Sequence, residues 1–487
     1  MSGSLERYGE TRGGERRDAA QSEPHNDAGA LVSGLPHWEN RELTGEFTGL
    51  QEKRPGMDVP FLMLTLLILL IGVIMVLSAS FARGYYTNGE PMRVFMRQLV
   101  FAVSGVAIML VVSRIGVKAM SRWSYALLAF SVFMLVAVLF VGIEVNEATR
   151  WLGFEGGGGS FSFQPSEVAK LALIMSFSQW ICANSRTKMR TFKYGIVPFV
   201  AVTAVIVGLL MLEPHISASI IIVALTAIMI FAGGARLRWF LLAFLAVALV
   251  LGAIMLPMLK ESADEDSDVG LTEQIAQMNL AGGRFSYADK RIDAWLNPEA
   301  DPMHSGYQIL QSLYAVGSGG LLGQGLGQSR QKYLYLPEEH NDYIFAIVCE
   351  ELGFIGAMLI LLLFLLLIVR GYWLALHAKD RYSALVATGI TSLLAIQVFL
   401  NVAVVTNLLP ATGISLPFFS YGGTALWIQL FQMGIVLAVS REIPREARAQ
   451  GSGVRGQGTG TAGEARAQGS GLRGQGSGDG RGEGYEV

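Results

Sequence analysis

The chain has 487 residues, of which 52% are hydrophobic and only 16% are charged, and its mean hydropathy is +0.43. Soluble globular proteins carry about 25% charged residues, so this composition excludes an ordinary soluble protein and indicates a membrane protein. The formal net charge of −2 gives no basic surface for nucleic acid, which we exclude as a partner.

The chain begins with a polar segment, residues 1–56, that is rich in Gly, Glu and Arg, and we expect a disordered tail there. Apolar runs that are long enough to cross a bilayer follow this segment. Ten such runs cover residues 59–82, 95–113, 122–143, 165–184, 194–212, 216–233, 238–258, 342–369, 382–408 and 422–440. The sequence therefore predicts an all-α polytopic membrane domain over residues 57–443, with about ten transmembrane helices.

The charges of the short loops orient these spans. The loops after spans 2, 4, 6 and 8 are basic, whereas "EPH" and "LPATGISLPFFS" on the other side contain no Lys or Arg. Because basic loops remain on the inside of a membrane, we place them in the cytoplasm. An even number of spans then puts both termini in the cytoplasm, in a multi-pass protein of the cell inner (cytoplasmic) membrane.

One connection is much longer than the others. Residues 259–341 separate spans 7 and 8 on the outer face, and a loop of this length is usually functional. Its stretch "YQILQSLYAVGSGGLLGQGLG" is mildly apolar and rich in glycine. This stretch predicts a short helix and a glycine turn at the membrane surface, not an eleventh span. Residues 444–487 form a Gly-rich repeat, for which we expect a disordered cytoplasmic tail.

Charged residues inside a span are costly and usually mark a site or an internal pair. Glu167 and Lys170 lie at the start of span 4, where their spacing places them on one helical face. Arg150 and Trp151 precede them on the outer face. For Glu167 and Lys170, a structural ion pair and a functional site are equally good interpretations. Arg150 and Trp151 are read as an interfacial anchor or as groups facing an anionic lipid headgroup.

The long outer loop contains "NPEADPMHSGYQ", in which prolines and a glycine prevent a helix. By residue type alone, Asp301 is a turn aspartate that caps the helix beginning near Gly306. The alternative is a general base held at the outer membrane surface. Two adjacent carboxylates, Glu350 and Glu351, lie within span 8 and need partners there. The sequence predicts no set of metal ligands.

Three stretches resemble one known family. They are "QPSEVAKL", "NPEADPMHSGYQILQSLYAVGSGGLLGQGLGQSRQKYLYLPEEHNDYIFAIVCEELGFIG" and "NLLPATGISLPFFSYGGTALW". Together they are similar to the SEDS family (shape, elongation, division and sporulation), whose members include FtsW, RodA and SpoVE. The resemblance covers residues 57–443, and "GLGQSRQKYLYLPEEHNDYIFA" is more similar to the FtsW and SpoVE branch than to RodA.

This resemblance implies a peptidoglycan glycosyltransferase of cell division. Such an enzyme polymerises lipid II, an undecaprenyl-diphosphate-linked disaccharide peptide, with inversion at the outer face of the cytoplasmic membrane. The family's essential aspartate corresponds to Asp301, and the rest of its motif corresponds to Gly306, Tyr307 and Gln308. The family's Arg-Trp pair and its intramembrane Glu and Lys correspond to Arg150, Trp151, Glu167 and Lys170. The implied partners are a division-type penicillin-binding transpeptidase and other division proteins.

The implied reaction needs a base for a sugar hydroxyl and cations for a departing diphosphate. Asp301 is the candidate base, and Arg150 and Lys170 are the candidate cations. No cofactor is required, although Mg²⁺ or Mn²⁺ would also suit the leaving group. One departure from the family is His215, which stands where an aspartate is usual. The alternative function is a lipid II flippase without bond chemistry, which the intramembrane charges suit equally well.

Overall fold

The computed structural model describes residues 56–145, 148–156, 159–213, 215–236, 291–303 and 306–443. The predicted tails, the seventh predicted span at 238–258 and the first part of the long outer loop lie outside these residues. The predictions made for those segments therefore stay predictions.

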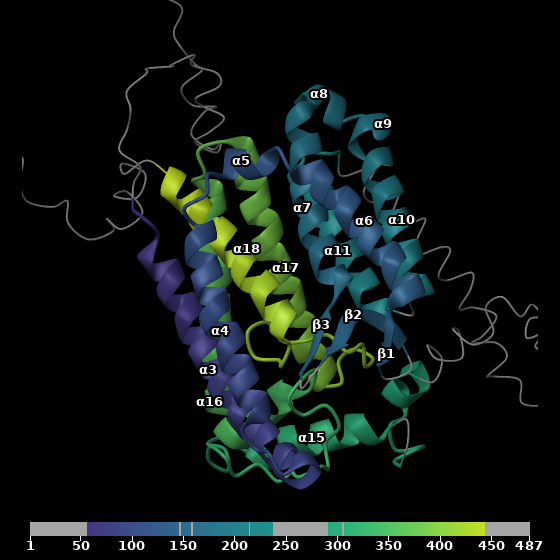
Figure 1. Ribbon diagram of the computed structural model, residues 1–487, viewed down its shortest axis with the longest axis vertical. Helices are drawn as coiled ribbons and strands as arrows, with labels where there is room; N and C mark the ends of the chain where they lie inside the picture. The colour runs from purple at the N-terminus through teal and green to yellow at the C-terminus, as the bar shows by residue number, and fades with distance from the viewer. Residues whose placement is uncertain are drawn as a thin grey trace, which may run out of the picture.

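The described residues form a bundle of long helices (Figure 1). Nine of the ten predicted spans coincide with helices in the described ranges, although α16 extends to Leu376 instead of residue 369. These helices are α3 (Val59–Arg83), α4 (Arg93–Val112), α6 (Ser124–Val141), α7 (Pro165–Ala183), α10 (Val197–Leu212), α11 (Ile216–Ala232), α16 (Ile344–Leu376), α17 (Arg381–Val405) and α18 (Gly423–Glu442). Seven helical segments of the described chain are long and apolar enough to cross a membrane. The all-α membrane architecture is thus confirmed, while the full count of ten rests on the sequence.

The helices pack in two groups that share a centre. One group of buried side chains joins α3, α4, α16, α17 and α18, and the other joins α6, α7, α10 and α11. The central helices α17 and α18 bury 67% and 72% of their spanning windows, against 22% for α4 and for α6. Polar side chains on the central helices therefore meet protein, whereas the outer helices present apolar side chains.

Short elements mark the two ends of the bundle. The basic loops contain α5 (Val117–Ser121), α8 (Arg186–Met189) and α9 (Phe192–Gly195), which lie together at one end in Figure 1. At the opposite end lie α15 (Tyr307–Gly319) and a small sheet. We call these the basic end and the hairpin end. As the loop charges predict, the basic loops share one end of the molecule.

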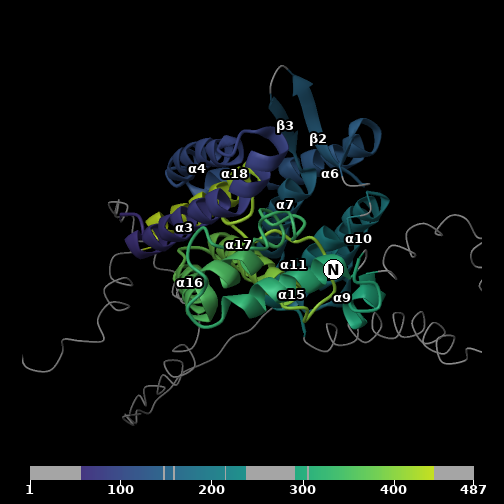
Figure 2. The ribbon, with the colours of Figure 1, turned by 90° about the horizontal axis from the view of Figure 1, so that it is seen from below.

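The sheet was not predicted from the sequence. It comprises β1 (Ile143–Val145), β2 (Ala148–Gly156) and β3 (Gly159–Phe163), which are antiparallel in that order. Phe154 pairs with Phe161 across β2 and β3, and Trp151 pairs with Ile143 across β1 and β2. Figure 2 shows β2 and β3 projecting beyond α6. Arg150 and Trp151 therefore lie on a strand of a hairpin and not in an irregular link.

The predicted short helix and glycine turn are both present. α15 is followed by Gly320, Gly323, Gly325 and Gly327, all with positive φ. This turn packs against a break in α16 at Gly353, where φ is 67° and ψ is −172°. Across the break, the N–H of Phe354 donates to the Gly320 carbonyl at 2.9 Å, and that of Gly325 donates to the Glu351 carbonyl at 3.0 Å. The turn thus satisfies backbone groups that the break would leave unpaired.

Candidate functional site

Asp301 lies in a turn that is pinned on both sides. The Asp301 carbonyl accepts a hydrogen bond from the N–H of Gly306 at 3.0 Å. A Cβ on Gly306 would lie 2.0 Å from the Pro298 carbonyl oxygen, so only glycine fits this close approach. The N-cap residue of α15 is Gly306. Asp301 therefore precedes the N-cap by five positions and does not occupy the capping position that its residue type suggests.

Long-range contacts hold this turn over the ends of α17 and α16. Before it, Trp295 donates from Nε1 to the Asn407 carbonyl at 3.0 Å. After it, Ser312 of α15 donates to the Val405 carbonyl at 2.9 Å. Gln308 donates from Nε2 to the Pro337 carbonyl at 3.3 Å. Tyr307, the first residue of α15, is partly buried. The motif residues after Asp301 thus connect its turn to the segment that enters α16.

Glu167 and Lys170 form a buried ion pair in the first turns of α7. The Lys170 Nζ atom lies 2.6 Å from Glu167 Oε1, and the two residues are 2% and 7% exposed. Pro165 occupies the first helical turn, where its missing N–H costs nothing. The two side chains share one helical face, as their spacing predicts, and this face is buried inside the protein.

Three further groups surround this pair at the hairpin end. Arg150 of β2 and Lys170 both act electrostatically on His215, in the turn between α10 and α11. Burial lowers the pKa of His215 to about 3, and these two positive charges act in the same direction. Burial also raises the pKa of Glu213 to about 8, with Arg150 opposing the shift. Near pH 7 both the imidazole of His215 and the carboxyl of Glu213 are therefore neutral.

The loop between α17 and α18 contacts Arg291 and α11. Arg291 donates from Nη1 to the Ala411 carbonyl at 2.6 Å, and Ser217 of α11 donates to the Thr412 carbonyl. The charges of Arg150 and Arg291 both act on the Asp342 carboxylate. Cations that are distant in sequence thus gather at the hairpin end. We call Arg150, Glu167, Lys170, Glu213 and His215 the hairpin-end cluster.

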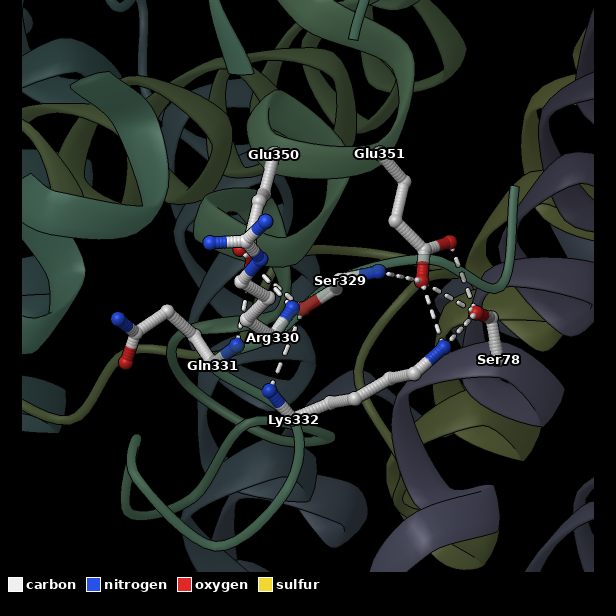
Figure 3. Close-up of polar contacts among 7 residues, drawn as sticks. All are labelled: Ser78, Ser329, Arg330, Gln331, Lys332, Glu350 and Glu351. Carbon is white, nitrogen blue, oxygen red and sulfur yellow. Dashed lines mark hydrogen bonds and ion pairs between the residues drawn. The ribbon is translucent and has the colours of Figure 1, made fainter. Parts of the chain in front are cut away.

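Glu350 and Glu351 have the partners that their position in the membrane core requires (Figure 3). Glu351 accepts hydrogen bonds from Ser78 of α3 at 2.6 Å and from Lys332 at 2.9 Å. Glu350 accepts from the hydroxyl of Ser329 and from the backbone N–H of Arg330. These residues form a second buried group, which we call the α16 cluster. Its partners Ser78, Ser329 and Lys332 were missed in the sequence, where only the need for partners was visible.

Arg83, at the last turn of α3, adds another link to the same segment. Its Nε and Nη2 atoms donate to the two carboxylate oxygens of Glu339 at 2.8 and 2.7 Å. Burial raises the pKa of the Glu339 carboxyl, but the hydrogen bonds with His340 and Arg83 outweigh it, so the pKa is lowered. Glu339 is therefore an ionised structural partner, and the segment from Ser329 to Glu339 is fixed to both α3 and α16.

Comparison with known proteins places this architecture in a family. Residues 59–444 match the family model described as cell cycle protein, FTSW_RODA_SPOVE. Stage V sporulation protein E of Bacillus subtilis is 41% identical over 391 residues, which cover 80% of this chain and 98% of that protein. A probable peptidoglycan glycosyltransferase FtsW of Trichlorobacter lovleyi is 38% identical over 385 residues, covering 79% and 93% of the two chains.

Solved structures agree with the sequence relatives. A chain from a structure described as showing the coordination of polymerization and crosslinking by a peptidoglycan synthase complex aligns with a TM-score of 0.60 and 26% identity. The alignment covers 79% of this chain and 98% of that one. Rod shape determining protein RodA of Thermus thermophilus shares the fold, with a TM-score of 0.55, 24% identity and coverage of 80% and 97%. The family resemblance read from the sequence motifs is thereby confirmed, and the chain belongs to the cell cycle protein family of FtsW, RodA and SpoVE.

Proposed function

We propose that this protein is a peptidoglycan glycosyltransferase that polymerises lipid II into glycan strands during cell division. Two observations support this function best: Arg150 and Lys170 gather around His215, and an anchored turn holds Asp301. The names of the relatives agree with this activity. In this proposal the hairpin end faces outward from the inner membrane, and both termini are cytoplasmic.

The reaction follows from the chemistry of these groups. A hydroxyl of one lipid-linked sugar attacks the anomeric carbon of another, which bears the lipid diphosphate. The new C–O bond forms as the bond to the diphosphate oxygen breaks, with inversion at that carbon. The hydroxyl proton passes to the Asp301 carboxylate as general base, and the electron pair leaves with the diphosphate. Arg150 and Lys170 stabilise the charge that develops on this leaving group.

The remaining motif residues hold or orient these groups. Glu167 fixes the Lys170 ammonium at 2.6 Å, and Trp151 lies beside Arg150 on β2. Gly306, Tyr307 and Gln308 set the turn of Asp301 and contact the lipid-linked sugar. The proposal needs no cofactor. A bound Mg²⁺ or Mn²⁺ would add positive charge at the same diphosphate, and treatment with EDTA distinguishes the two cases.

A division-type penicillin-binding transpeptidase and other division proteins are the partners in this proposal. The solved peptidoglycan synthase complex, described as coordinating polymerization and crosslinking, supports such an assembly. The predicted tails at 1–56 and 444–487 have too few apolar residues to form a stable docking core. We therefore expect the membrane domain to bind the transpeptidase, and deletion of residues 446–487 to leave co-purification intact.

The decisive experiment measures glycan strands on a gel after incubation of purified protein with lipid II, alone and with the transpeptidase. Asp301→Asn keeps the shape of the side chain but cannot accept the proton. We expect this change to lower the rate by about 10²- to 10⁴-fold. Because the residue lies in a turn and not at a helix cap, the melting temperature should stay close to that of the wild type.

Glu299→Gln is the matched control, because it removes an exposed carboxylate two residues away. It should leave glycan synthesis unchanged. Wild-type synthesis by Asp301→Asn would end the general-base assignment. A wild-type protein that moves lipid II across vesicles but makes no strands, even with its partner, would favour the flippase.

A further inference from the structure

The connection between α7 and α10 carries positive charge and no negative charge. We call residues 185–196, which include α8 and α9, the α8–α9 turn. Its basic side chains are all exposed, and they are Arg186, Lys188, Arg190 and Lys193. No Asp or Glu occurs from position 168 to position 212. Among the described residues, Lys188, Arg190 and Lys193 form no salt bridge, so these three charges are available to an anion from outside the chain.

The α8–α9 turn is firmly packed at the basic end (Figure 1). Met189 and Ile196 are 0% and 4% exposed, and they are buried in the group of side chains that joins α6, α7, α10 and α11. A Cβ on Gly195 would lie 2.0 Å from the Met189 carbonyl oxygen, so only glycine allows this close approach of α9 to α8. Trp180 of α7 donates from Nε1 to the Tyr194 carbonyl at 3.2 Å. These contacts fix the backbone that carries the basic side chains.

Two ammonium groups of the turn lie around one aromatic ring. The Nζ atoms of Lys188 and Lys193 are each 5.9 Å from the centroid of the Tyr194 ring. Tyrosine and tryptophan are enriched where a membrane meets water, and lysine side chains extend their charged ends to the headgroups there. Tyr194 and Trp180 therefore indicate the headgroup level, and the two ammonium groups lie beside them.

An apolar surface continues from these charges along α10. Phe192 of α9 is 50% exposed. Val197, Val200 and Ala204 of α10 are also exposed, and their spacing of three and four residues places them on one helical face. A phospholipid with a negative headgroup matches both surfaces, because it combines a charged phosphate with apolar chains. A free phosphate matches only the charges.

Two other connections at the basic end contact a carboxylate. Between α4 and α6, the N–H of Val117 donates to Glu442 Oε1 at 3.2 Å, and Lys118 acts electrostatically on this carboxylate. Lys379, between α16 and α17, acts on the same group and is followed in the chain by Asp380. Lys118 and Lys379 are exposed, as Lys188 and Lys193 are, but a carboxylate of the protein compensates their charge. They therefore provide matched controls.

We infer that the α8–α9 turn binds the headgroup of an anionic phospholipid in the membrane leaflet at the basic end. Lys188 and Lys193 contact the phosphate, and Arg190 adds positive charge beside them. The acyl chains lie along Phe192 and the exposed face of α10. In the proposed orientation this is the cytoplasmic leaflet, whose anionic lipids attract basic segments. The inference goes beyond the proposed function and does not depend on it, because the site lies at the opposite end from Asp301.

Titration of the full chain in detergent with phosphatidylglycerol tests this site, with bound lipid detected by native mass spectrometry. Each basic side chain near a membrane surface contributes roughly a factor of five to the affinity for anionic lipid. Lys188→Gln with Lys193→Gln should therefore raise the dissociation constant of the first bound phosphatidylglycerol about 25-fold. Phosphatidylcholine, whose headgroup has no net charge, should bind the variant and the wild type equally.

Lys118→Gln with Lys379→Gln is the matched control, because it removes the same number of exposed charges from the same end. It should leave the dissociation constant for phosphatidylglycerol unchanged. Glycerol phosphate carries the phosphate without acyl chains, and it should not displace the lipid at equal concentration. Binding of phosphatidylglycerol to the wild type should also weaken as the salt concentration rises, because the interaction is electrostatic.

Unchanged binding of phosphatidylglycerol by Lys188→Gln with Lys193→Gln would overturn the inference. An equal loss in the control variant would overturn it too, since the attraction would then belong to the whole basic end. An equal loss of phosphatidylcholine binding would show that the charge of the headgroup is not recognised. Displacement of the lipid by glycerol phosphate would identify the ligand as a soluble phosphate and not a phospholipid.

Discussion

Two buried polar clusters lie in this bundle, and they differ in how completely their atoms are paired. In the α16 cluster, Glu350 and Glu351 accept hydrogen bonds from Ser78, from Lys332 and from the segment between them (Figure 3). In the hairpin-end cluster, by contrast, Glu213 and His215 each have a buried atom without a hydrogen-bond partner among the described residues, and so does Ser166, next to Glu167 in the chain.

The two clusters have similar burial and a similar carboxylate–lysine pair, so burial alone does not identify a site. The carboxylates of the α16 cluster have used their acceptor oxygens within the fold, although Gln331 Oε1 beside them has no hydrogen-bond partner among the described residues. An unsatisfied cluster has a free-energy deficit that a ligand removes. In the proposed function the hairpin-end cluster binds substrate and the α16 cluster is structural, and the following variants test that division.

In the hairpin-end cluster a large effect on catalysis is expected at Lys170. Lys170→Met removes a cation from the leaving group and should lower glycan synthesis by about 10²- to 10³-fold. It also leaves Glu167 unpaired, which lowers stability. The double change Glu167→Gln with Lys170→Met should recover the melting temperature but not the rate in the lipid II gel assay. Recovery of the rate by the double variant would make this pair structural, like that of the α16 cluster.

The next effect is on stability, at Lys332. Lys332→Met leaves the Glu351 carboxylate buried without its cation, at a cost of about 3–5 kcal/mol. Thermal unfolding in detergent should show a clear loss of stability. Here the double change Glu351→Gln with Lys332→Met should recover both the melting temperature and glycan synthesis. A double variant that is stable but inactive would show that the α16 cluster takes part in catalysis.

The smallest effect concerns the dependence of stability on pH. The folded-state pKa of His215, about 3, lies below the ordinary value of about 6.5, so the stability linked to its neutral form is present above pH 6.5. That stability is lost as the pH falls toward 3. Relative to His215→Gln, which cannot titrate, the wild type should lose roughly 2 kcal/mol between pH 7 and pH 5.

Melting curves of the two proteins at both pH values check this effect. The raised pKa of Glu213 acts in the opposite sense in both proteins, so the difference between them isolates the imidazole. Parallel loss of stability in the wild type and in His215→Gln would show that His215 is not held neutral in the fold.

The sequence predicted what depends on short-range patterns. Continuous apolar runs located the described spans, and the spacing of Glu167 and Lys170 predicted their shared face because a helix repeats every 3.6 residues. The loss of charge and the gain of glycine after α15 likewise predicted its glycine turn. Each of these features depends on residues within a few helical turns of one another.

The features that were missed depend on distant contacts. Ser78 meets Glu351 across 273 positions, and no local pattern indicates that contact. The β2–β3 hairpin was missed because the segment contains the run "EGGGGS", and so many glycines do not favour a strand. The association of Arg150 with His215 depends on that hairpin. The candidate residues could thus be named from the sequence, but their assembly into one cluster could not.

The close packing of Gly323 against the break in α16 limits what genetics can reveal about this enzyme. A Cβ on Gly353 would lie 2.2 Å from the Gly323 nitrogen, and a Cβ on Gly323 would lie 2.2 Å from the Glu351 carbonyl oxygen. Both residues also have positive φ. A random screen for inactive alleles will therefore recover substitutions at these glycines as readily as at Asp301. A loss of function caused by a substitution at either glycine indicates that the protein does not fold. Only inactive variants that still accumulate in the membrane identify residues that take part in the reaction.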